Sequence, residues 1–145
     1  MIIYKSQLSK KEELEISGIL SEIIDEYSDF YLTRDNIRLY IKDNIDILIS
    51  SLKKGDKIAF SYEEGIAVVD GYSDNANRKY VKILARDENS ANKLLKVLNH
   101  NIKDILFAKI KKNSPLLKIF KNNGFKFKGS RGLEELLIKE TNNAQ

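Results

Sequence analysis

The sequence contains no cysteine, and it has only one proline and one histidine among its 145 residues. Without cysteine there can be no disulfide, no thiolate metal site and no cysteine nucleophile. A single histidine without cysteine lacks the usual ligand set of a zinc site, so we expect no metal. Prolines and glycines are scarce and 42% of the residues are hydrophobic, which excludes a fibrous or disordered chain.

Long hydrophobic runs are also missing. No apolar run approaches the roughly 20 residues that a membrane-spanning helix needs, and the first residues lack the basic and apolar segments of a signal peptide. We therefore expect a cytoplasmic protein that does not bind membranes. The length predicts a single domain over residues 1–139 with a frayed tail over residues 140–145, as a monomer or homodimer.

The two halves of the chain carry opposite charge. Residues 1–75 hold 9 Lys and Arg against 15 Asp and Glu, a net of −6, whereas residues 76–145 hold 16 against 6, a net of +10. These charges either form the solvated faces of a lysine-rich protein or direct the second half to a polyanion and the first half to a cationic molecule.

Hydrophobic periodicity predicts the element order β-α-α-β-β-β-α-β-α-β-β. A capping box of Ser9 and Glu12 begins the first helix, Thr33 caps the second, and Gly55 stops the second helix after residue 52. Strands that alternate with helices indicate an α/β fold, with a mixed sheet covered on both faces. The strands are expected at residues 2–5, 57–62, 65–72, 80–85, 105–110, 125–128 and 133–138.

The most informative segment is a short predicted helix within residues 113–125. Ser114 can accept a hydrogen bond from a first-turn amide, and the missing N–H of Pro115 costs nothing at the start of a helix. Asn123-Gly124 supplies a left-handed exit before the strand that starts at Phe125. The buried stripe of this helix is expected to comprise Leu116, Leu117, Ile119 and Phe120.

This segment resembles the penultimate helix of the GNAT superfamily, the acyl-CoA-dependent N-acyltransferases. The residues that fit the superfamily pattern are Asn113, Leu116, Ile119, Gly124 and Phe125. The element order resembles the GNAT order over essentially the whole chain. The resemblance implies a mixed, mostly antiparallel sheet and an enzyme that transfers an acetyl group from acetyl-CoA to a primary amine.

The resemblance also implies a coenzyme site after the strand at residues 80–85. GNAT proteins have Gln/Arg-x-x-Gly-x-Gly/Ala there, and this chain has Arg86-Asp87-Glu88-Asn89-Ser90-Ala91, with Asn in place of the first Gly. The alternative is an ordinary capped helix start, because Asp87 and Glu88 bring negative charge to the expected phosphate position. The coenzyme-binding residues implied are Leu84, Ala85, Arg86, Asn89, Ser90, Ala91, Asn113, Lys118 and Lys121.

Amine acetylation needs a base for the amine proton and an acid for the departing thiolate. The tyrosine that GNAT proteins often use as the acid is Phe120 here, which has no proton to give and is better interpreted as a core aromatic residue. We expect Tyr80 to supply the acid, with Ser114 or Tyr72 as alternatives. The base is expected to be Glu63 or Asp70, with Glu64 or Asp74 as alternatives. The alternatives are an exposed turn for Glu63 and a simple edge-strand charge for Asp70.

Three functions follow from these patterns. The first is an N-acetyltransferase, for which the acidic early helices favour a cationic amine acceptor. The second is a GNAT-like domain that has lost catalysis and now binds a partner. The third, less favoured, is a nucleic-acid-binding module that uses the lysine-rich segment 109–131, although its alternating Phe125 and Phe127 resemble a strand with one buried face more than a stacking surface.

Overall fold

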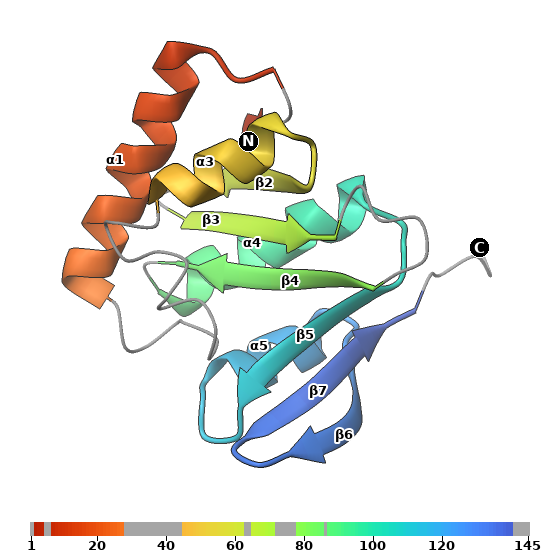
Figure 1. Ribbon diagram of the computed structural model, residues 1–145. Coiled ribbons are helices and arrows are strands. Elements are labelled where there is room, and N and C mark those ends of the chain that lie inside the picture. The colour runs from red at the N-terminus through yellow and green to blue at the C-terminus, as the bar shows by residue number, and fades with distance from the viewer. Residues whose placement is uncertain are drawn as a thin grey trace.

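The fold is a seven-stranded sheet with helices on both faces (Figure 1). The computed structural model describes residues 2–4, 7–27, 45–62, 65–71, 78–85 and 87–140. The strands are β1 (Ile2–Tyr4), β2 (Lys57–Tyr62), β3 (Gly65–Asp70), β4 (Lys79–Leu84), β5 (Leu106–Lys111), β6 (Lys126–Arg131) and β7 (Glu134–Lys139). The helices are α1 (Lys10–Tyr27), α3 (Ile45–Lys53), α4 (Glu88–Asn101) and α5 (Leu116–Asn122).

The strand order is β1-β2-β3-β4-β5-β7-β6. Every neighbouring pair is antiparallel except β4 and β5, which are parallel and are connected through α4. The predicted mixed, mostly antiparallel α/β sheet is therefore confirmed. The first half of the predicted second helix, from Thr33 to residue 44, lies outside the described residues.

Local sequence signals set the ends of the helices. The Glu12 amide donates to Ser9 Oγ at 3.1 Å, and the Ser9 amide donates to Glu12 Oε1 at 3.0 Å, so the predicted capping box is formed. Gly55, with φ of +83°, follows α3 as expected. At α5, the Leu116 amide donates to Ser114 Oγ at 3.1 Å, and Gly124 ends the helix with φ of +93°.

Alternation along the strands builds two apolar layers. On one face, α4 and α5 pack on residues such as Val81, Ile83 and Ala108. On the other face, α1 and α3 pack on residues such as Ile66, Val68 and Leu84. Because successive residues of β4 point to opposite faces, Tyr80 and Lys82 share the face of Leu84, toward α1 and α3.

The C-terminal strand pair differs from the prediction. Strand β6 begins one residue later than predicted and runs further, to Arg131, because it pairs with β7 across a two-residue turn, Gly132-Leu133. Phe125 is buried, but Phe127 is 55% exposed, so the expected single buried face of this strand is wrong. The reason is that β6 is the edge strand, with a bulge between Phe127 and Gly129. None of the helices in the described ranges has the length and apolarity to cross a membrane.

Candidate active site

The central feature of the site is a gap between β4 and β5. These parallel strands have only two registered pairs, Lys79 with Leu106 and Tyr80 with Phe107. Beyond Tyr80, β4 stays paired with β3 as far as Leu84, while β5 stays paired with β7 as far as Lys111. The two strands therefore diverge toward their carboxyl ends (Figure 1).

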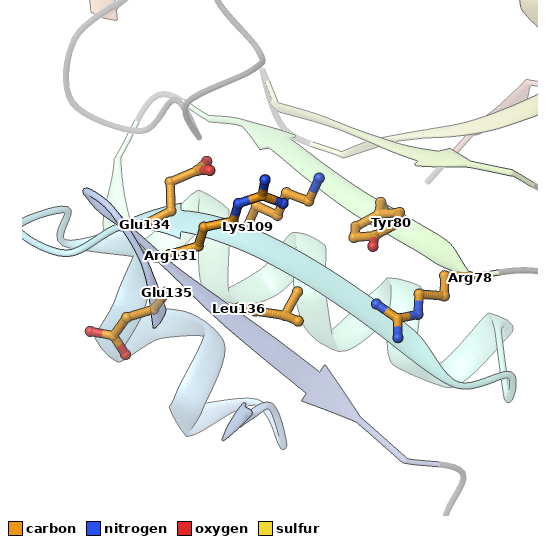
Figure 2. A pocket seen from close by; sticks show the side chains of 7 residues that line it. All are labelled: Arg78, Tyr80, Lys109, Arg131, Glu134, Glu135 and Leu136. Carbon is orange, nitrogen blue, oxygen red and sulfur yellow. The ribbon is translucent and has the colours of Figure 1, made fainter. Parts of the chain in front are cut away.

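A cavity of about 450 Å³ lies beside this gap (Figure 2). It is bordered by the start of β4, by β5 and by the β6–β7 hairpin. Tyr80, the predicted acid, lines the cavity at the last registered pair of the diverging strands. The full lining is Arg78, Tyr80, Lys109, Arg131, Glu134, Glu135 and Leu136.

Aromatic rings hold two of the cavity's cations. The Arg78 guanidinium lies 4.8 Å from the centroid of the Phe107 ring, and Lys109 Nζ lies 4.9 Å from that of Tyr80. The two rings are themselves in contact, with centroids 5.7 Å apart. Each cation interacts with the negative face of its ring, and this contact orients its side chain along the sheet.

Arg78 is also placed by its backbone. Gly71, which follows β3, has φ of +74°, a conformation that side chains other than glycine rarely adopt. A Cβ atom at Gly71 would lie 2.7 Å from the Arg78 carbonyl oxygen. The close approach of these two segments therefore depends on glycine, and it brings Arg78 to the edge of the cavity.

The β6–β7 hairpin brings a cation and an acid to the cavity. Arg131 and Glu134 are the last paired residues before the turn, so their side chains share one face of the sheet. The Lys112 amide donates to the Leu133 carbonyl at 2.9 Å, which ties the turn to the end of β5. The Glu134 residue is only 8% exposed, so its carboxylate is held within the protein at the cavity wall.

The predicted base Asp70 lies on the same face, opposite Tyr80 in the β3–β4 register, but its carboxylate is already paired. It contacts Lys57 Nζ closely and lies 3.0 Å from Lys82 Nζ. Burial acts to raise the pKa of Asp70, but the charges and hydrogen bonds of the two lysines outweigh it and lower the pKa. A carboxylate stabilised in its ionised form is a poor proton acceptor. Glu63, the other predicted base, lies outside the described residues.

The predicted phosphate loop has the geometry of a capped helix. Asp87 is the N-cap of α4, and its Oδ1 accepts from the Ser90 amide at 2.8 Å. The Ala91 amide donates to the Asp87 carbonyl at 3.0 Å, and Asn89 lies within the helix rather than in a turn. Helix α4 begins early because Asp87 caps it, which places a carboxylate where phosphate oxygens are expected. Arg86 lies outside the described residues.

The other predicted coenzyme residues surround the gap unevenly. Leu84 and Ala85 are fully buried at the carboxyl end of β4. Asn113 is exposed in the turn between β5 and α5, and Lys118 is exposed on α5. Lys121 Nζ lies 3.5 Å from Glu135 Oε1. The coenzyme contacts of these residues remain predictions.

Phe120 has the core position that the sequence indicated. It is fully buried and packs edge-on against Phe125, with ring centroids 4.9 Å apart. The position at which GNAT proteins often carry a tyrosine that acts as the general acid therefore faces the apolar layer in this chain. Tyr80 remains the tyrosine that lines the cavity within the described part of the chain.

The sequence did not identify Glu134 as a site residue. It is the first residue of β7 and has no motif around it, and only its pairing with Arg131 across the hairpin turn brings it to the cavity. Lys109 and Arg131 appeared in the sequence only as members of a lysine-rich segment. The structure brings both to one cavity, which no local pattern indicates.

The fold can be compared with known proteins. No protein-family model matches the sequence, and no curated protein sequence matches it. Among solved structures, an N-acetyltransferase from Staphylococcus aureus Mu50 has a TM-score of 0.60 and 16% identity, over 97% of this chain and 98% of that chain. A GNAT-family acetyltransferase from Listeria monocytogenes has a TM-score of 0.60 and 12% identity, over 96% and 94%.

A third structure, the PaiA N-acetyltransferase from Thermoplasma acidophilum, was solved in complex with coenzyme A. It has a TM-score of 0.55 and 14% identity, over 97% of this chain and 99% of that chain. These similarities extend over nearly the full length of each protein, and they agree with the element order and the diverging β4 and β5. The chain has the fold of the GNAT-superfamily acetyltransferases.

Proposed function

We propose that this protein is an acyl-CoA-dependent N-acyltransferase that moves an acetyl group from acetyl-CoA to a primary amine. The observation that carries the proposal is the divergence of β4 and β5 directly beside a cavity that contains Tyr80 and Glu134. A thioester that enters along the gap would meet an amine held in the cavity. Holding both reactants in this way supplies much of the rate of a two-substrate reaction.

The chemistry can be assigned to residues of the cavity. Glu134 accepts a proton from the acceptor ammonium, and the neutral amine attacks the thioester carbonyl carbon. The C–N bond forms, the C–S bond breaks, and the Tyr80 hydroxyl donates a proton to the departing thiolate. The second proton of the attacking nitrogen returns through solvent to the Tyr80 phenolate, and Glu134 releases its proton to solvent. Glu134 takes the role of the base in place of Asp70, because the Asp70 carboxylate is held by Lys57 and Lys82.

The direct test is release of free thiol from acetyl-CoA in the presence of a panel of primary amines. We expect turnover with at least one amine, and the Tyr80→Phe variant should lower kcat by roughly 100- to 10,000-fold, the range of a lost general acid. The matched control is Tyr4→Phe, because Tyr4 is buried at the end of β1, its hydroxyl contacts Glu15 of α1, and it does not line the cavity. Absence of turnover throughout the panel would overturn the proposal.

A lapsed GNAT-like domain that binds a partner is the second candidate. The buried Phe120 and the carboxylate of Asp87 at the start of α4 favour it, since both depart from the superfamily pattern. A rise in melting temperature with acetyl-CoA but no thiol release would support this candidate. Nucleic-acid binding by the lysine-rich segment 109–131 is less favoured, because Phe125 is buried and Lys109 lies at the cavity.

A further inference from the structure

The charges that line the cavity identify a class of acceptor. Arg78, Lys109 and Arg131 are positive, and Glu134 and Glu135 are negative. Figure 2 shows the Glu135 side chain directed away from the other charged groups, and its Oε1 lies 3.5 Å from Lys121 Nζ. The balance within the cavity is therefore three cations against Glu134.

Among the ion pairs recorded for the described residues, none involves Arg78, Lys109 or Arg131. Arg78 and Lys109 lie instead over aromatic rings, at 4.8 Å and 4.9 Å. The N–H groups of a guanidinium lie in its own plane, so a guanidinium that lies over a ring can still bind a carboxylate in a bidentate manner.

The positive and negative groups are arranged around Tyr80. In Figure 2, Glu134, Arg131 and Lys109 lie toward one end of the cavity, Arg78 lies at the other, and Tyr80 lies between. An amine held by Glu134 would leave cations within the same small cavity for a second group of the ligand. The volume of about 450 Å³ limits the ligand to a small molecule or the end of a chain.

We infer that the acceptor is a primary amine that also carries a carboxylate, in the manner of an amino acid, with its ammonium at Glu134 and its carboxylate at the cavity's arginines. That this ligand is the acceptor of the acetyl group rests on the proposed function. A simple polyamine, as the acidic early helices suggested, would place further positive charge against Arg78, Lys109 and Arg131. A phosphate monoester dianion would meet repulsion from the buried Glu134.

The test is calorimetric binding to the full chain without acetyl-CoA, so that it does not depend on catalysis. The probes are pairs that differ only by a carboxylate: L-phenylalanine with 2-phenylethylamine, and L-lysine with 1,5-diaminopentane. The pair of O-phosphoethanolamine and ethanolamine tests whether a phosphate group binds in place of the carboxylate. We expect the carboxylate member of at least one pair to bind at least tenfold tighter than its partner.

Variants locate the binding. Arg131→Gln and Arg78→Gln should each reduce the preference for the carboxylate member at least fivefold, and Glu134→Gln should weaken both members of a pair. The matched control is Lys126→Gln, because Lys126 is exposed on β6 and does not line the cavity. Circular dichroism of each variant reports whether it folds.

The inference would be overturned by equal affinity within both amino-acid pairs or by no binding of any probe at millimolar concentration. It would also be overturned by binding of the phosphate probe alone, or by a carboxylate preference that is unchanged in both arginine variants. Carboxylate-dependent binding without acetyl transfer would support the ligand class and remove the transferase function. Equal kcat/KM for acetyl transfer to both members of a pair would support the transferase function and remove the ligand class.

Discussion

At the scale of single residues, the Asp70 cluster shows how a charge that the sequence assigned to catalysis serves stability. Asp70 ends β3, and Lys57 and Lys82 flank it on β2 and β4. The three side chains are each 20% exposed or less, so their mutual attraction is less weakened by water than at the surface. A cross-strand cluster of this kind holds β2, β3 and β4 in register.

Asp70→Asn removes the negative charge and leaves Lys57 and Lys82 without it. We expect the free energy of unfolding at pH 7 to fall by about 2 kcal/mol, because breaking a partly buried pair costs more than breaking an exposed one. The folded-state pKa of Asp70 is lowered, so its stabilisation is present above the unfolded pKa of about 3.9 and is lost as pH falls through the folded pKa. The difference between the two proteins should therefore shrink below about pH 4.

Urea denaturation across the pH range measures this effect. The matched control is Asp104→Asn, because Asp104 is 57% exposed and lies 3.7 Å from Lys79, so its removal should change stability by less than about 0.5 kcal/mol. A difference between native protein and Asp70→Asn that persists undiminished at the lowest pH would contradict the assignment.

At the scale of elements, α4 carries two requirements at one end. Its first turn needs a cap, which Asp87 supplies through the Ser90 amide. The same turn is where the GNAT resemblance implies coenzyme phosphates. One carboxylate cannot cap the helix and leave that position attractive to an anion, because both uses draw on the same amides and the same positive end of the helix dipole.

Asp87→Ser keeps a capping oxygen and removes the charge. We expect the affinity for coenzyme A to rise roughly tenfold, since the loss of one nearby repulsive charge is worth about 1 to 2 kcal/mol. Stability should change by only a few tenths of a kcal/mol, whereas Asp87→Ala should lose about 1 kcal/mol with its cap. Titration calorimetry measures the affinity, and an unchanged or weaker affinity in Asp87→Ser would place the phosphates elsewhere.

Helix and turn chemistry was predictable from the sequence because each signal is local. The Ser9–Glu12 box, Ser114 and Gly124 each act within a few residues, and all three have the expected geometry. The cavity was not predictable, because Arg78 and Glu134 meet there only after the sheet forms. Phe127 was placed wrongly, since alternation predicts a buried face without revealing that β6 is an edge strand.

At the scale of the molecule, the sheet consists of two parts joined at a short seam. One part contains β1 to β4, the other contains β5, β7 and β6, and the registered pairs Lys79–Leu106 and Tyr80–Phe107 join them. Behind the seam, Asn99 donates to the Asn123 carbonyl at 2.8 Å, and Asn123 donates to Asn92 Oδ1 at 2.9 Å. These bonds connect α4 to the end of α5 across the two parts.

Acetyl-CoA that occupies the gap should stabilise the whole fold. At 100 times its dissociation constant, the ligand should add roughly 2.7 kcal/mol to the free energy of unfolding. Hydrogen exchange should slow most in β4 beyond Tyr80 and in β5 beyond Phe107, because these segments border the gap. It should slow least in β1. Exchange protection confined to other elements would contradict binding in the gap.

The narrow seam has a consequence for how such a protein can change. The β6–β7 hairpin supplies Arg131 and Glu134 to the cavity, and it is anchored through β5 and the turn at Lys112 rather than through β4. If the proposed function holds, sequence changes at the hairpin tip would alter which amine is accepted while the gap between β4 and β5 keeps its shape. A graft of this one hairpin from another protein of the same fold would then be expected to exchange the acceptor preference.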